Sequence, residues 1–212
     1  MAGRLGLGSS TLISPAETLR LLPTIEPAGL RGGVRYLDGQ FDDARLAVCL
    51  AQTVVDHGGI VLNYVRVVRL LKEHGRVRAV VARDEESGRE FELHAKVVVN
   101  ASGIFTDEVH QMDDPDVAPM MTVSQGAHIV LDRSFLPGDT ALMVPKTDDG
   151  RILFAIPWQE RVVVGTTDTP MDGPSLEPRP LRQEIEFLLQ HAGRYLSKDP
   201  IESDILAMFA GL

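Results

Sequence analysis

The chain has 212 residues, of which 44% are hydrophobic and 24% charged. This composition excludes a disordered chain, a collagen-like repeat and a small disulfide-stapled protein. The 30 acidic residues outnumber the 21 basic ones and give a net charge of −9, which argues against nucleic acid as a partner. The single cysteine, Cys49, excludes an internal disulfide and a cysteine-based zinc cluster, and its apolar neighbours predict a buried, unreactive thiol.

The N-terminal part of the sequence predicts two helices followed by an antiparallel meander. Ser14 precedes Pro15 and Glu17, which are the residue types of a helix N-cap, an N1 position and a capping box. Apolar residues recur at helical spacing after Asp42 and Asp43, either of which can cap the second helix. The rest of the first forty residues is rich in Gly and Pro and predicts loops. The predicted helices span 14–22 and 42–57, and the predicted strands span 60–71, 76–83 and 90–94.

A short run that is apolar on both faces, Val97-Val98-Val99, lies in the predicted strand 96–100. Such a run is typical of a strand buried in a parallel sheet. The small residues that follow, Ala101-Ser102-Gly103, would let the phosphate or ribose of a cofactor approach the backbone. A plain turn capped by Ser102, leading into a helix over 106–111, is the alternative interpretation.

The second half predicts four strands, a helix and a final apolar run. The strands span 122–131, 141–144, 151–157 and 161–165, the helix spans 179–196 and the apolar run spans 205–209. The inner face of the helix is predicted to carry Leu181, Ile185, Leu188 and Leu189. Mixed helices and strands with one parallel element indicate an α+β or α/β protein.

Two polar motifs lie at strand ends, where loops project functional groups from a rigid scaffold. Gly165-Thr166-Thr167-Asp168 follows an apolar strand, and a Ser/Thr or Asx turn is its alternative reading. His128 follows Gly126 at the start of another strand and could act as an acid, a base or a donor to an anion. A structural role for His128 stays open. The other five histidines are predicted to lie in turns or on solvated faces, and none has the spacing of a metal site.

Five motifs carry a resemblance when they are taken in order. They are Asp42-Asp43-Ala44-Arg45-Leu46, Val99-Asn100-Ala101-Ser102-Gly103, Gly126-Ala127-His128-Ile129-Val130, Arg151-Ile152-Leu153-Phe154-Ala155-Ile156-Pro157-Trp158 and Gly165-Thr166-Thr167-Asp168. Together they resemble the middle section of the FAD-dependent glycerol-3-phosphate dehydrogenases, within the D-amino-acid-oxidase-like flavoprotein superfamily. The resemblance is collinear over essentially the whole chain.

The resemblance implies a middle fragment, because the G-x-G-x-x-G fingerprint that holds the FAD pyrophosphate in the family does not occur here. The family also continues beyond the segment that 209–212 resembles. The implied fold class is α+β, with a mainly antiparallel sheet as substrate domain, flanking helices and remnants of an FAD-binding α/β domain. We expect 1–58 and 95–112 to be those remnants, 59–94 to be a β-meander and 113–212 to be the substrate-binding (cap) domain.

The resemblance also implies roles for particular residues. His128 matches a substrate-pocket histidine able to assist removal of a hydroxyl proton, and Thr166 and Thr167 match a threonine pair lining that pocket. The residues matching FAD contacts are Val67, Ala101, Ser102 and Gly103.

The implied activity of the intact enzyme is oxidation of sn-glycerol 3-phosphate to dihydroxyacetone phosphate, with electrons passed through FAD to a quinone. The fragment alone is expected to be inactive and to lack FAD, and it could form a homo-oligomer. The sequence shows no signal peptide and no apolar stretch of the ~20 residues that a spanning helix needs. We therefore expect a cytoplasmic location, with a peripheral position on the inner membrane surface left open.

Three alternatives remain at this point. One is a glycerol-3-phosphate oxidase, another is an amine or 2-hydroxyacid oxidase of the same superfamily, and the third is a non-enzymatic binding module. The motifs at 42–45 and 165–168 argue against the amine oxidases but do not separate dehydrogenase from oxidase.

Overall fold

The computed structural model describes residues 7–148 and 150–212 and divides them into two compact units. The sheet unit holds the described residues up to Asp38 together with Thr122–Leu212, and the meander unit holds Gly39–Met121. This division differs from the predicted one, since the residues before Asp38 belong with the second half of the chain. The derivation of 1–58 and 95–112 from an FAD-binding domain stays a prediction.

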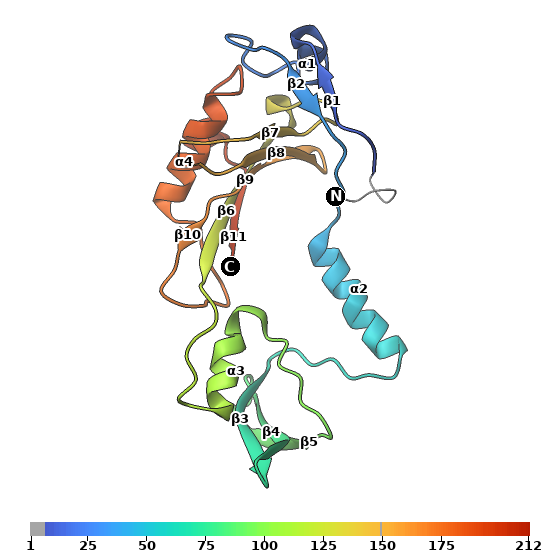
Figure 1. Ribbon diagram of the computed structural model, residues 1–212, viewed down its shortest axis with the longest axis vertical. Helices are drawn as coiled ribbons and strands as arrows, with labels where there is room; N and C mark the ends of the chain where they lie inside the picture. Colours follow the sequence, from blue (N-terminus) through green and yellow to red (C-terminus); the bar gives the residue numbers. More distant parts are fainter. Residues whose placement is uncertain (1–6, 149) are drawn as a thin grey trace. The chain divides into compact units, whose positions relative to one another are not determined.

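The sheet unit is built on an antiparallel sheet of six strands in the order β10-β6-β9-β8-β7, with β11 also paired to β6 (Figure 1). The strands are β6 (Ser124–Asp132), β7 (Leu142–Val144), β8 (Leu153–Trp158), β9 (Arg161–Gly165), β10 (Thr169–Pro170) and β11 (Ala207–Gly211). All of these pairings are antiparallel. The mixture of helices and mainly antiparallel sheet predicted from the sequence is confirmed, with strand ends displaced by a few residues.

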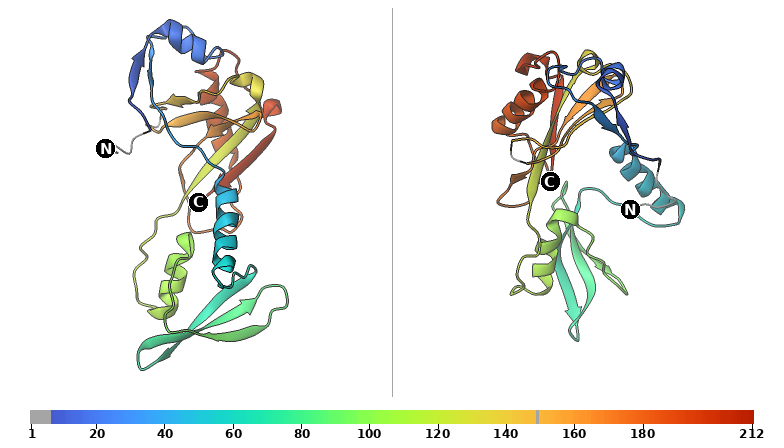
Figure 2. Two further views of the ribbon diagram at one scale, coloured as in Figure 1. Left: turned by 90° about the vertical axis from the view of Figure 1, so that its right-hand side faces the viewer. Right: turned by 45° about the horizontal axis from the view of Figure 1, so that its top comes forward.

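One face of this sheet packs against helix α4 (Arg182–Gly193) to form the core (Figure 2). Strand β6 alternates strictly, so that Ala127, Ile129 and Leu131 are buried while His128 and Val130 on the opposite face are only half-buried. Burial of Ile185 and Leu188 confirms part of the predicted inner face of α4. The remaining core residues include Leu22, Ile25, Phe135, Leu136, Val144, Leu153, Ala155, Val162, Val164, Ala192 and Leu196.

The predicted inner face of α4 was incomplete. Leu181 is the N-cap and is 37% exposed. Glu184 and His191 are buried instead, each satisfied by hydrogen bonds described below. A polar residue facing a core leaves no signal in an apolar periodicity, which is why the pattern missed both.

The N-terminal segment contains more structure than predicted. Helix α1 (Pro15–Leu21) begins as expected, because Ser14 Oγ accepts a hydrogen bond from the Glu17 backbone N at 3.2 Å. The segments around it were predicted as loops, but β1 (Thr11–Ile13) pairs antiparallel with β2 (Gly33–Arg35). Strands of three residues are too short to show a periodicity, so this prediction was wrong.

The meander unit contains the predicted three-stranded meander. Its strands are β3 (Val65–Glu73), β4 (Arg76–Asp84) and β5 (Glu90–His94), in the order β3-β4-β5. The turn between β3 and β4 places His74 and Gly75 at φ values of 52° and 75°, the positive values that a tight hairpin turn requires. After the meander come a 3-10 turn (Gly103–Phe105) and helix α3 (Thr106–Asp113).

Helix α2 (Asp43–Asp56) forms where it was predicted but buries none of its residues. Asp42 is its N-cap and accepts a hydrogen bond from the Arg45 backbone N at 2.9 Å. The apolar stripe of the helix is exposed, and Cys49 is exposed with it. The prediction of a buried thiol is therefore wrong, because an apolar sequence context buries a side chain only where another element covers it.

The predicted strand at 96–100 is also wrong. These residues adopt no strand, and Val97 and Val99 are 73% and 78% exposed. A run that is apolar on both faces needs covering layers on both sides, and the part of the chain that the structure describes provides neither for it. Over the same described residues, no helix is both long and apolar enough to span a bilayer.

Candidate active site

His128 lies on the half-buried face of the six-stranded sheet, opposite the face that packs against α4. The register of the sheet places it between Gly165 of β9 and Phe209 of β11. The rings of His128 and Phe209 are stacked, with centroids 4.9 Å apart and planes inclined by 8°. The sheet thus holds an imidazole on its surface with an aromatic partner from a neighbouring strand.

Gly165 is the residue that makes room for this imidazole. A Cβ atom at position 165 would lie 2.2 Å from Cδ2 and 2.7 Å from Nε2 of His128, so any side chain there would collide with the ring. The sequence singled out Gly165 as part of a polar turn, whereas its relation to His128 follows from strand register, which the sequence did not reveal.

Thr166 lies beside the same stretch of β6. Its hydroxyl donates to the backbone O of Thr167 at 3.0 Å, and a Cβ atom at Gly126 would lie 2.4 Å from Thr166 Oγ1. The peptide bond between Gly165 and Thr166 is cis. The structure therefore brings Thr166 next to the strand segment that carries His128.

Thr167 points the other way, into the side of the sheet that α4 covers. It is buried, and its hydroxyl donates to Glu184 Oε1 at 2.9 Å while accepting from the Ala127 backbone N at 2.8 Å. The structure therefore does not bring the Thr167 hydroxyl together with the His128 ring. Alternation along an extended segment separates the two neighbouring threonines.

Glu184 organises this buried side and was missed by the sequence analysis. Its two carboxylate oxygens accept hydrogen bonds from Thr167 Oγ1, Thr169 Oγ1, Gln125 Nε2 and the Leu181 backbone N, at 2.6–2.9 Å. Burial raises the pKa of Glu184, but these four donors outweigh it and hold the pKa below its ordinary value. The acidic residue three positions after an N-cap was the available signal.

The residues predicted to contact a cofactor lie in the meander unit. Val67 is half-buried in β3, whereas Ala101, Ser102 and Gly103 form an exposed turn. Asn100 shapes this turn, because its Oδ1 accepts hydrogen bonds from both the backbone N and the Oγ of Ser102. Gly103 has a φ of +59°, and nothing lies within 4 Å of where its Cβ would be. The backbone of the turn is accordingly open to a ligand.

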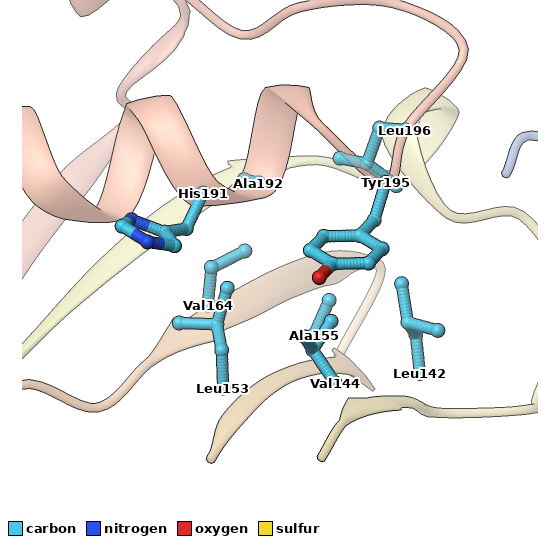
Figure 3. A pocket seen from close by; sticks show the side chains of 9 residues that line it. All are labelled: Leu142, Val144, Leu153, Ala155, Val164, His191, Ala192, Tyr195 and Leu196. Carbon is cyan, nitrogen blue, oxygen red and sulfur yellow. The ribbon is translucent and has the colours of Figure 1, made fainter. Parts of the chain in front are cut away.

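His191 was predicted to lie in a turn or on a solvated face, but it is buried. Its Nδ1 lies 2.9 Å from the Phe187 backbone O, and its Nε2 accepts a hydrogen bond from the Asp148 backbone N at 3.4 Å. Figure 3 shows its ring, with that of Tyr195, among the side chains that line a small cavity. The cavity is about 10 Å³, room for about one water molecule at most, so it cannot be a substrate site. No group of three or more potential metal ligands occurs within 7–148 and 150–212.

Comparison with known proteins gives a consistent result. The sequence model of the family described as "FAD dependent oxidoreductase" (DAO) matches residues 1–212. A Caenorhabditis elegans protein named "Probable glycerol-3-phosphate dehydrogenase, mitochondrial" is 38% identical over 216 residues, covering 100% of this chain and 30% of the relative. The chain thus spans about a third of the length of the curated relatives it matches.

Two solved structures extend the comparison. The glycerol-3-phosphate dehydrogenase of Bacillus halodurans, complexed with FAD, is 30% identical, with a TM-score of 0.86 over 94% of this chain and 40% of that one. The L-alpha-glycerophosphate oxidase of Mycoplasma pneumoniae, with FAD bound, is 19% identical, with a TM-score of 0.73 over 99% of this chain and 54% of that one. The second similarity shows the fold alone. The resemblance stated from the five motifs is confirmed.

Proposed function

Because the chain belongs to the DAO family of FAD-dependent oxidoreductases, we propose that it is the middle part of an enzyme that oxidises sn-glycerol 3-phosphate to dihydroxyacetone phosphate. The names of the relatives support this substrate. The single observation that carries the proposal on this chain is the imidazole of His128, held on the half-buried sheet face between Gly165 and Phe209.

The residues of the meander unit fit part of an FAD site. The exposed Ala101-Ser102-Gly103 turn leaves its backbone open, as close approach of a ribose or phosphate requires. We assign FAD contacts to this turn and to Val67. The pyrophosphate cradle must come from another part of the intact enzyme, because this sequence contains no G-x-G-x-x-G. When bound, FAD supplies the acceptor for the hydride that leaves C2 of the substrate.

In this proposal, residues of this chain accept the proton of the substrate's C2 hydroxyl. Hydride loss from C2 requires removal of the proton on the C2 hydroxyl, and an imidazole nitrogen of His128 is chemically suited to accept it. Thr166, beside the stretch of β6 that carries His128, is proposed to line the substrate pocket, and its hydroxyl, which donates to the Thr167 carbonyl, retains its lone pairs to accept a hydrogen bond from the substrate. Thr167 contributes to the pocket by anchoring the backbone of β6 through the Ala127 N–H.

The dianionic phosphate needs Arg or Lys partners, which we expect from the remainder of the intact enzyme. In this proposal the sheet unit is the substrate-binding part, and the meander unit includes remnants of the FAD-binding part.

A quinone is the proposed electron acceptor, in keeping with a cytoplasmic protein at the inner membrane surface. The exposed apolar side chains of α2 favour self-association.

An oxidase that passes electrons to oxygen is the second candidate function. The motifs at 42–45 and 165–168 do not separate dehydrogenase from oxidase, so this alternative stays open. Oxygen uptake during turnover by the intact enzyme separates the two, since a dehydrogenase reduces an artificial acceptor but consumes little oxygen.

The test of His128 is its replacement in the intact enzyme. His128→Ala is expected to lower kcat/KM for glycerol 3-phosphate by ~10²-fold or more, the usual scale for loss of a positioned acid–base group. His128→Gln keeps a hydrogen-bond donor but cannot take up a proton. Near-normal activity of the Gln variant alone would mean that His128 positions the substrate, whereas equal losses indicate proton transfer.

A matched control is His94→Ala, which removes an exposed imidazole from strand β5 in the meander unit. It should leave kcat/KM unchanged. Full activity of His128→Ala, assayed with an artificial electron acceptor, would remove His128 from the active site.

A further inference from the structure

The imidazole of His128 is confined from both neighbouring strands. Strand β11 presents Phe209, whose ring stacks on it, and strand β9 presents Gly165, whose missing side chain leaves the space that the imidazole occupies. Resting on the function proposed above, we propose that Phe209 and Gly165 are positioning residues that fix the orientation of His128 for proton removal.

Phe209 lies outside the hydrophobic core of the sheet unit. It is 48% exposed. Its ring centroid lies 4.9 Å from that of His128 with nearly parallel planes, inside the range of about 4.5–7 Å that stacked aromatic rings prefer. The ring of this half-exposed residue therefore stacks on the side chain of the proposed proton acceptor.

Gly165 restricts the same ring from the opposite strand. A Cβ atom there would lie within 2.8 Å of three ring atoms of His128, namely Cδ2, Nε2 and Cγ. The imidazole thus rests directly on the backbone of β9, and Phe209 limits its movement from the side of β11. A proton acceptor held in this way keeps its nitrogen at a constant position, and small misplacements of reacting groups cost large factors in rate.

The first test uses the intact enzyme and conservative replacement. Phe209→Leu keeps an apolar side chain but removes the ring, and we expect kcat to fall ~10-fold while KM changes by less than about twofold. Phe209→Tyr keeps the stack and should restore kcat to within about twofold of the original. Phe91→Leu, which removes a partly exposed ring from strand β5, is the matched control and should have no effect.

The second test reports on the stack without any activity. In NMR spectra of this chain, the imidazole protons of His128 should carry the upfield ring-current shift of Phe209. The shift should disappear in Phe209→Leu, persist in Phe209→Tyr, and change in Gly165→Ala because the added methyl displaces the ring. If Gly165→Ala does not fold, the two Phe209 variants still test the inference. An unchanged His128 spectrum in Phe209→Leu would overturn the inference.

A double variant separates this inference from the function on which it rests. If Phe209 acts through His128, adding Phe209→Leu to His128→Ala should produce no further loss of kcat. If the single variant His128→Ala is slow while the single variant Phe209→Leu is fully active, only the positioning role is overturned. A fully active His128→Ala enzyme overturns the role of His128 and the positioning role together.

Discussion

Glu184 illustrates how a buried polar group holds the candidate site in place. It is 2% exposed, and it ties α4 to the turn after β9 through Thr167 and to strand β6 through Gln125. Thr167 in turn holds the backbone N of Ala127, the residue before His128. The Glu184 carboxylate, with all four hydrogen-bond donors present, stabilises the contact between α4 and the sheet. Loss of one partner leaves buried polar groups unsatisfied.

We predict that Glu184→Gln lowers the free energy of unfolding by about 1–3 kcal/mol at neutral pH. The carboxamide offers one neutral acceptor oxygen where the carboxylate offers two charged ones, so two of the four donors lose their acceptor and the other two bond an uncharged oxygen. Urea unfolding of this chain measures the change. Glu186→Gln, which alters an exposed carboxylate paired with Arg182, is the control and should change stability much less.

The pKa of Glu184 also predicts a pH dependence. Because the folded-state pKa lies below the ordinary value of 4.5, the stabilisation is fully present above that value and is lost as the pH falls through the folded-state pKa. Lowering the pH from about 7 to about 3.5 should therefore destabilise the original chain more than Glu184→Gln. Equal acid destabilisation of both would contradict this assignment.

The position of a residue could be predicted from the sequence where a local motif determines it. It could not be predicted where it depends on the pairing of distant strands. Glycine beside threonine at 165–166 and the histidine at 128 were found from the sequence, and the structure places them close together. Which of Thr166 and Thr167 lies on the side of His128, and the contact between Phe209 and His128, depend on pairing between segments far apart in sequence. The sequence around Cys49 and His191 did not predict that Cys49 is exposed and His191 buried, because exposure depends on which element covers a residue.

At the scale of elements, caps and turns were read reliably from the sequence. Ser14 and Asp42 cap α1 and α2 as expected, and β4 and β5 begin and end at or next to their predicted bounds, whereas β3 begins at Val65 and not at residue 60. These signals are local, so they do not depend on the rest of the fold. The predicted strand at 96–100 failed for the opposite reason, because a buried strand exists only when its neighbours are present.

Helix α2 is predicted to be weakly protected in this chain. It has 14 residues and buries none of them, and a helix of this length without tertiary packing is marginal in water. Amide hydrogen exchange should therefore be much faster in α2 than in α4, whose residues Ile185, Leu188 and Ala192 are buried. Equal protection of the two helices would show that α2 is covered in solution.

At the scale of the whole molecule, the two units carry different halves of the proposed chemistry. The sheet unit holds His128 and Thr166, and the meander unit holds the open turn and Val67 proposed to contact FAD. The family was recognisable from sequence because five motifs kept their order. The boundaries of the units were not, since residues before Asp38 join the sheet unit through contacts distant in sequence, such as the bridge between Ile25 and Leu196.

This chain alone is predicted to purify without stoichiometric FAD. The exposed turn at 101–103 offers only part of a binding site, and the helix N-terminus that would hold the pyrophosphate has no counterpart motif in the sequence. The absorbance spectrum of the purified chain, before and after incubation with FAD and desalting, measures this directly. A flavin spectrum at one equivalent per chain would contradict the prediction.

The most direct test of the central claim is anaerobic mixing of the intact, FAD-loaded enzyme with glycerol 3-phosphate, followed by flavin absorbance. We predict rapid loss of the oxidised flavin bands with glycerol 3-phosphate, no such loss with glycine or proline, and a rate at least ~10²-fold lower in His128→Ala. Flavin reduced by an amino acid but not by glycerol 3-phosphate, or reduced at the original rate in His128→Ala, would contradict it.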